Sequence, residues 1–188
     1  IDGASSANIV SINGSGISND TISFIGGSYT VRFNGASYIQ IKDVTVINES
    51  ANKVIWFSNE SHDITIEDCR VIGQLINQNY VSAAITASLL ETNASTQGKN
   101  AHHIYILNNI IIGGYNGVDL IGKTDYRKGN IWIENNTFKD QNYCGIRVQY
   151  MDSVKVKGNY MYDSQSNWSG IGAYLIRVSH FQVEENYF

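Results

Sequence analysis

The stretch GNIWIENNTF, from Gly129 to Phe138, decides the fold because its pattern returns along the chain. An apolar–x–apolar pair is followed three residues later by an Asn, and two residues further on by a large apolar residue. The stretches SVKVKGNYMY (153–162) and HFQVEENYF (180–188) have the same order. Self-similarity of this kind indicates a repeat architecture, so the apolar pair is an anchor on which the whole chain can be aligned.

The anchor pair occurs six times, at Ile39/Ile41, Ile64/Ile66, Ile104/Ile106, Ile131/Ile133, Val154/Val156 and Phe181/Val183, with spacings of 25, 40, 27, 23 and 27 residues. A strand-like segment precedes the pair by about eight residues, and a short apolar segment follows it. Tight hairpin turns do not separate these segments. Three strands in each period predict a coil that returns above itself with a rise of ~4.8 Å. We therefore predict an all-β, single-stranded parallel β-helix (a solenoid) of about six coils of three short strands, forming one domain over residues 1–188.

Asparagine occupies the same offset in the last four repeats, at Asn109, Asn136, Asn159 and Asn186. Equal offsets lie above one another in a stack, so these residues predict an Asn ladder in the bend between the second and third strands. Asn tolerates the left-handed backbone of such a bend, and its amide can bond the next coil. Cys69 holds this position in an earlier repeat. We expect Cys69 and Cys144 to be buried thiols that form no disulfide framework.

The composition excludes some classes of function. Apolar residues make up 43% of the 188 residues, charged residues 16%, and the net charge is −4. This charge argues against nucleic acid as a partner, and no apolar run approaches the ~18 residues of a membrane span. The sequence lacks an initiator Met and ends within a repeat, so we interpret it as an excerpt of a longer chain. Open solenoid ends then suggest self-association as well.

The coil pattern and the ladder closely resemble the right-handed parallel β-helix proteins, which include pectate lyases, alginate and chondroitin lyases, polygalacturonases and related epimerases. The resemblance covers roughly Tyr29 to Phe188, and Ile1-Asp2-Gly3 is similar to a stretch that enters the first coils of such enzymes. It implies a right-handed coil, a polysaccharide or glycan as partner, and an extracellular or cell-surface location.

One residue of the strand before each anchor pair points outward, and these residues form a column. Its members are Arg32, Trp56, Thr86, Asp119, Arg147 and Tyr174. The resemblance implies that this face is the substrate groove. Aromatic rings stack on sugars and Arg binds carboxylates, so we predict substrate binding by Arg32, Trp56 and Tyr174, with Tyr126 and Arg127 from a nearby loop.

Asp119 and Arg147 fall on adjacent coils, with Cα atoms expected about 5 Å apart. The lyase resemblance implies β-elimination on an acidic polysaccharide. Asp119, with Asp125, would bind a cation such as calcium, and Arg147 or Lys123 would be the base. The alternative is a surface ion pair of small energetic consequence. A calcium site needs more carboxylates than this column offers, and no polygalacturonase-like or epimerase-like catalytic motif is present.

Two long loops, residues 88–101 and Gly122–Lys128, leave the same edge of neighbouring coils, and we expect them to form a wall beside the column. His62 and His102 share an offset and are predicted to stack as polar turn residues. Of the N-x-S/T sequons, those at Asn59 and Asn93 are the best candidates for glycosylation.

Two hypotheses remain for function. One is an extracellular polysaccharide-active enzyme that acts by elimination. The other is a non-catalytic, glycan-binding, adhesive or structural solenoid of a surface or fibre protein. In an enzyme, Asp119, Arg147 and Lys123 should converge on one free point. In a non-catalytic solenoid they should be splayed or bonded to one another.

Overall fold

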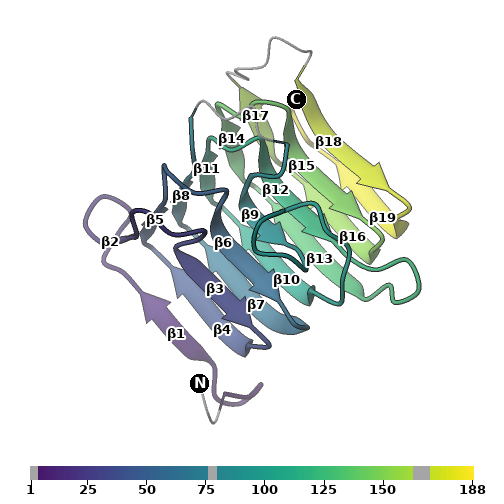
Figure 1. The fold of residues 1–188 in the computed structure, drawn as a ribbon, viewed down its shortest axis with the longest axis horizontal. Helices are drawn as coiled ribbons and strands as arrows, with labels where there is room; N and C mark the ends of the chain where they lie inside the picture. The colour runs from purple at the N-terminus through teal and green to yellow at the C-terminus, as the bar shows by residue number, and fades with distance from the viewer. Residues whose placement is uncertain (1–3, 76–79, 163–169) are drawn as a thin grey trace.

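The computed structural model describes residues 4–75, 80–162 and 170–188, and these residues wind through three parallel sheets (Figure 1). The described residues contain strands, turns and bends but no helix. Neighbouring strands within each sheet come from successive coils of the chain, and every pairing between named strands is parallel. The predicted all-β parallel solenoid is confirmed. No helix able to cross a membrane occurs in the described part of the chain.

The largest sheet holds the anchor pairs, and we call it the anchor sheet. Its seven strands are β1 (Val10–Asn13), β4 (Ser37–Lys42), β7 (Ser61–Glu67), β10 (Ala101–Leu107), β13 (Gly129–Glu134), β16 (Asp152–Lys157) and β19 (Ser179–Glu184).

The other two sheets have six strands each. The short sheet follows the bend after the anchor sheet and consists of β2 (Thr21–Ser23), β5 (Thr45–Ile47), β8 (Arg70–Ile72), β11 (Ile110–Ile112), β14 (Thr137–Lys139) and β17 (Tyr160–Tyr162). The column sheet carries the predicted outward column and consists of β3 (Val31–Asn34), β6 (Lys53–Ser58), β9 (Ala83–Ala87), β12 (Asn116–Ile121), β15 (Cys144–Gln149) and β18 (Ile171–Ile176).

The six predicted anchor pairs lie in register in β4, β7, β10, β13, β16 and β19. The structure adds a further strand that the alignment missed, because Val10 and Ile12 of β1 pair with Ile39 and Ile41. A longer turn separates β1 from β2, and its Gly16 has a φ of 133° that side chains rarely adopt. This turn shifts the third strand away from its usual offset, which hid the coil in the sequence.

The core is a stack of side chains that point into the coil from each sheet. In the anchor sheet Ile41, Ile66, Ile106, Ile133 and Val156 are fully buried one above another. The alternation of inward and outward residues along each strand produces this stack, because equal positions repeat at each coil. The interior is therefore continuous along the solenoid axis.

The thiols behave as predicted, since Cys69 and Cys144 are both free and buried. Burial raises the pKa of the Cys144 thiol to about 12. Both residues therefore act as small apolar side chains within the core.

The Asn ladder is confirmed in the bend between the anchor sheet and the short sheet. The Asn136 Nδ2 donates to the Ile106 carbonyl at 2.8 Å and to Asn159 Oδ1 at 3.0 Å, while its Oδ1 accepts from the Asn109 backbone at 2.9 Å. The left-handed residue of the bend is the one before the ladder, such as Asn135 with a φ of 55°. The expectation that the ladder residue itself is left-handed was wrong. Its task is to satisfy buried backbone groups of two coils.

Candidate functional site

The predicted column is confirmed as a stack. Strand register places its members directly beside one another in the order Arg32, Trp56, Thr86, Asp119, Arg147 and Tyr174. The prediction that all of them face solvent was wrong. Trp56 is 2% exposed, and Thr86 and Asp119 are 0% exposed. These three side chains point out of the sheet but do not reach water.

The loop between β9 and β10, residues 88–100, covers the centre of the column sheet, and we call it the covering loop (Figure 1). Trp56 Nε1 donates to the Ser88 carbonyl at 2.9 Å, and Thr86 Oγ1 donates to the Ala94 carbonyl at 3.2 Å. The expected wall beside the column is therefore a cover on top of it. Backbone carbonyls of the loop satisfy the polar groups that they bury.

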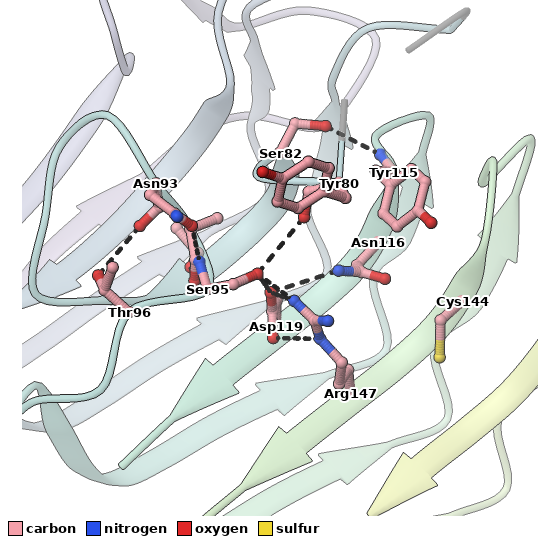
Figure 2. A network of polar contacts seen from close by, with 12 residues as sticks. Tyr80, Ser82, Asn93, Ser95, Thr96, Tyr115, Asn116, Asp119, Cys144 and Arg147 are labelled. Atoms are coloured by element: carbon pink, nitrogen blue, oxygen red, sulfur yellow. Dashed lines mark hydrogen bonds and ion pairs between the residues drawn. The ribbon is translucent and has the colours of Figure 1, made fainter. Parts of the chain in front are cut away.

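Asp119 and Arg147 form a closed ion pair under this loop, as Figure 2 shows. The Arg147 Nε donates to Asp119 Oδ1 at 2.9 Å, and its Nη2 donates to both Asp119 Oδ2 and Ser95 Oγ. Ser95 Oγ and Asn116 Nδ2 each donate to Asp119 Oδ2 at 3.3 Å. The alternative of an ion pair between these residues is therefore present, but its expected position at the surface was wrong, because the carboxylate is buried and held by three side chains.

The electrostatics of this pair are those of a structural bridge. Burial raises the pKa of the Asp119 carboxyl, and the guanidinium of Arg147 opposes that shift. Burial lowers the pKa of Arg147, but the hydrogen bond and charge of Asp119 outweigh it and the net pKa is raised. A general base needs a pKa near the working pH. The environment of Arg147 raises its pKa and so moves it further from the working pH.

The groups around Asp119 do not provide the oxygen ligands that a calcium ion needs. Arg147 occupies both carboxylate oxygens, whereas Ca²⁺ requires ~6–8 oxygen ligands. Asp125, the second predicted ligand, has a 71% exposed side chain that is bonded to Lys123 at 3.1 Å. Within residues 4–75, 80–162 and 170–188 no group of three or more His, Cys, Asp or Glu side chains is placed to hold a metal. Calcium binding stays a prediction without support from these contacts.

The loop Gly122–Lys128 lies next to the covering loop, since Thr124 Oγ1 donates to Gln97 Oε1 at 2.9 Å. The Lys123 ammonium donates to Asp125 Oδ2 at 3.1 Å within the loop, whereas the described partners of Asp119 are Arg147, Ser95 and Asn116. The Tyr126 ring lies 4.2 Å from the Lys99 ammonium. Arg127 is exposed. The structure does not bring these predicted substrate contacts into the column.

Arg32 and Tyr174 occupy the two ends of the column and are exposed. The guanidinium of Arg32 lies 4.1 Å from the Trp56 ring, and its Nε donates to Ser58 Oγ at 3.1 Å. Four coils separate Arg32 from Tyr174, and the covering loop occupies the space between them. The predicted groove is therefore interrupted at its centre.

Lys53 was missed by the sequence reasoning. This lysine in β6 is fully buried, donates to the Leu90 carbonyl at 3.1 Å and to the Glu91 carbonyl, and lies 4.7 Å from the Trp56 ring. Burial lowers its pKa to about 8. No pattern in the sequence marks Lys53, because its partners are backbone carbonyls of the covering loop.

The two predicted glycosylation sites lie in different environments. Asn59 is exposed, and its Nδ2 donates to Asn34 Oδ1 at 2.6 Å. Asn93 is half-buried in the covering loop, where its Oδ1 accepts from the Ser95 backbone at 2.7 Å. Glycosylation of both stays a prediction.

The predicted stacking of His62 and His102 is confirmed, but their placement in turns was wrong, because they lie in β7 and β10. The rings of His62 and His102 lie 4.8 Å apart and 6° from parallel. Asp63 contacts His62 Nδ1 at 2.7 Å and His103 Nδ1 at 3.2 Å. Burial, together with the nearby charges of Lys128 and His103, lowers the pKa of His102 to about 4.

The comparisons with known proteins agree with this architecture. The family described as "Right handed beta helix region" matches residues 75–188, which is more than half of the chain. The protein therefore belongs to the right-handed β-helix family, and its coil is right-handed. No curated protein matches the sequence. A fold of this kind is compatible with carbohydrate-active proteins and with solenoids of other functions.

Proposed function

We propose that the protein is a non-catalytic, glycan-binding β-helix that acts outside the cell. One observation carries the proposal: Asp119 and Arg147 are bonded to each other beneath the covering loop. The enzyme hypothesis requires these side chains to converge with Lys123 on a free point. Lys123 is instead bonded to Asp125. All three groups are tied in ion pairs, as the non-catalytic hypothesis requires.

Elimination needs three things that these contacts do not favour. A base must accept a proton, yet the pKa of Arg147 is raised. A cation must neutralise the substrate carboxylate, yet the Asp119 oxygens are occupied by Arg147. The polymer must reach the reacting groups, yet Asp119 is fully buried. Glycan binding requires none of these, because a rigid stack of coils presents outward side chains at a constant spacing of ~4.8 Å to a repeating polymer.

The test combines a lyase assay with a binding assay. The purified protein is incubated with pectate, alginate and glycosaminoglycans, with calcium and with chelator, and the ultraviolet absorbance of unsaturated product is followed. Affinity electrophoresis through gels that contain acidic or neutral polysaccharides is run in parallel. We expect no rise in absorbance and retarded migration in at least one gel. A rise that Arg147→Lys abolishes, in a variant shown to be folded, would establish the elimination mechanism instead.

A further inference from the structure

We infer that the outer face of the anchor sheet holds a binding site for a neutral saccharide, an assignment that rests on the proposed function. Its outward column consists of Ser11, Gln40, Thr65, Tyr105, Trp132, Lys155 and Gln182. Trp132 is 40% exposed, whereas Trp56, in the strand next to the edge strand β3 of the column sheet, is 2% exposed. The anchor sheet therefore presents an aromatic side chain to solvent in the middle of the solenoid.

A hollow of about 280 Å³ lies on this face, between Tyr38 and Tyr105. Gln40, Asp63 and Thr65 contribute to its lining. Thr65 is the neighbour of Tyr105 in the column. Because the threonine side chain is much smaller than the tyrosine, the surface is lower at Thr65 than at Tyr105. Small-molecule sites are commonly concave, with apolar or aromatic walls and a few convergent polar groups. The lining thus combines two tyrosines and two isoleucines with an amide, a carboxylate and the hydroxyl groups of a serine and a threonine.

The aromatic groups beside the hollow are fixed before any ligand binds. The rings of Tyr105 and Trp132 meet edge to face, with centroids 5.5 Å apart. Asn130 holds both of them: its Nδ2 donates to the Tyr105 hydroxyl at 3.0 Å, and its Oδ1 accepts from Trp132 Nε1 at 3.1 Å. Asn130 itself has a φ of 59°, a left-handed conformation that Asn tolerates. Rings held in this way lose little conformational entropy on binding.

The site extends beyond the hollow along the solenoid axis. Tyr38 is in β4 and Trp132 is in β13, which are three strand steps apart in the anchor sheet. At ~4.8 Å for each step, the distance is about 14 Å. A short oligosaccharide that runs along the axis can therefore occupy the hollow and contact Trp132 with the apolar face of a further sugar ring.

The charges favour a neutral sugar over a uronate. No Lys or Arg is among the described residues that line the hollow, and its charged group is the carboxylate of Asp63. Lys155, which lies 5.1 Å from the Trp132 ring, is bonded to Glu134 at 2.9 Å. An acidic sugar would bring its carboxylate toward Asp63 without a free cation to pair with it. Because both Asp63 oxygens already contact histidine nitrogens, the hydroxyl groups of a neutral sugar would exchange hydrogen bonds with Gln40, Thr65 and the tyrosines.

The experiment measures binding of the whole chain to neutral polysaccharides, namely xylan, galactan, mannan and β-glucan, and to pectate and alginate. Trp132→Ala and Tyr105→Ala are compared with wild type by affinity electrophoresis and calorimetry. Tyr162→Ala removes an exposed tyrosine from the short sheet and is the matched control. Thermal unfolding of every variant establishes that it is folded.

We expect at least one neutral polysaccharide to bind, with affinity reduced about tenfold or more by Trp132→Ala and Tyr105→Ala and unchanged by Tyr162→Ala. Binding that survives both anchor-sheet variants but is lost in Tyr174→Ala would overturn this site and leave the proposed function intact. Binding to pectate or alginate alone would overturn the neutral specificity. Absence of binding to every polysaccharide would overturn both the site and the proposed function.

Discussion

The outer faces of the column sheet and the anchor sheet are built by the same alternation, yet one is covered and the other is open. Trp56 and Trp132 both point outward from strands that have a neighbour on either side, but the two residues are 2% and 40% exposed. Strand alternation decides which side chains leave the core. Whether those side chains reach solvent depends on the length of the loop that connects the column sheet to the next strand of the anchor sheet.

The segment responsible is the covering loop between β9 and β10. The spacing of 40 residues between the anchor pairs of β7 and β10 includes the covering loop, which folds back over the column sheet. Arg147 then links β15 to β12 through Asp119 and to the loop through Ser95. A charged column that resembles a catalytic centre in the sequence thus becomes part of the packing between coil and loop.

The largest expected difference between the two faces concerns the tryptophans. Trp56→Ala should lower the free energy of unfolding by about 3–5 kcal/mol, because it leaves a cavity under the covering loop and removes the ring between Arg32 and Lys53. Trp132→Ala should cost only about 1 kcal/mol, the size of an exposed aromatic contact with Tyr105. Urea denaturation of both variants measures the difference. Equal costs would show that the loop does not seal the column sheet in solution.

The ion pair provides the next test of the covered face. Arg147→Ala should lower the free energy of unfolding by about 3 kcal/mol, because it leaves the buried Asp119 carboxylate without its cation. Ser95 and Asn116 remain as donors, which keeps the cost at the low end for a broken buried pair. The control is the double variant Asp119→Leu/Arg147→Met, which removes both charges and should recover much of the loss. A cost below about 1 kcal/mol for Arg147→Ala would place the pair in contact with water.

Acid should affect the two faces in opposite directions. The pKa of His102, near the start of β10 in the anchor sheet, is about 4, below its ordinary value of 6.5. The unfolded chain therefore binds this proton more readily, and the stability from neutral His102 is lost as the pH falls from 6.5 toward 4. The pKa of Asp119 is raised by burial, so its folded carboxyl takes up a proton before the unfolded one does. Acid does not destabilise the covered face through this group.

The free energy of unfolding should fall by roughly 1 kcal/mol through protonation of His102. The effect is this small because the ring is only half-buried and solvent screens its neighbours. Urea denaturation at a series of pH values between 7 and 4 measures it. His102→Gln should flatten the pH dependence in this window. A slope in this variant equal to that of the wild type would assign the effect to other groups.

The smallest expected effect concerns the exposed loop Gly122–Lys128. Lys123→Ala removes a surface ion pair with Asp125 and should change the free energy of unfolding by less than about 0.5 kcal/mol. It should also leave saccharide binding unchanged if the anchor sheet carries the site. Reduced binding in this variant would move the saccharide to the loop side of the column sheet.

Much of the architecture was predictable from local patterns. The anchor pairs and the positions of Asn109, Asn136 and Asn159 predict the register, because each coil repeats the same inward and outward positions. The order of the outward column from Arg32 to Tyr174 follows from the same register and is confirmed. The coil at β1 was missed because its bend has no ladder Asn and its turn is longer.

The candidate site was less predictable because its contacts are made between distant segments. Burial of Asp119 depends on Ser95, which lies in an insertion with no periodic pattern. Lys53 likewise depends on carbonyls of that insertion, at Leu90 and Glu91. The pairing of Tyr105 with Trp132 follows from register, but the hollow beside them exists because the neighbouring residue is the small Thr65.

By itself the sequence determined the parallel solenoid, its ladder and the stacking order of its columns, because these follow from apolar periodicity and equal offsets within a repeating coil. Only the tertiary structure decided which outer face is available. The covering loop buries polar groups of the column sheet and satisfies them with its own carbonyls, so the conformation of a non-repeating segment controls the exposure of a repeating one. No periodic pattern encodes that choice.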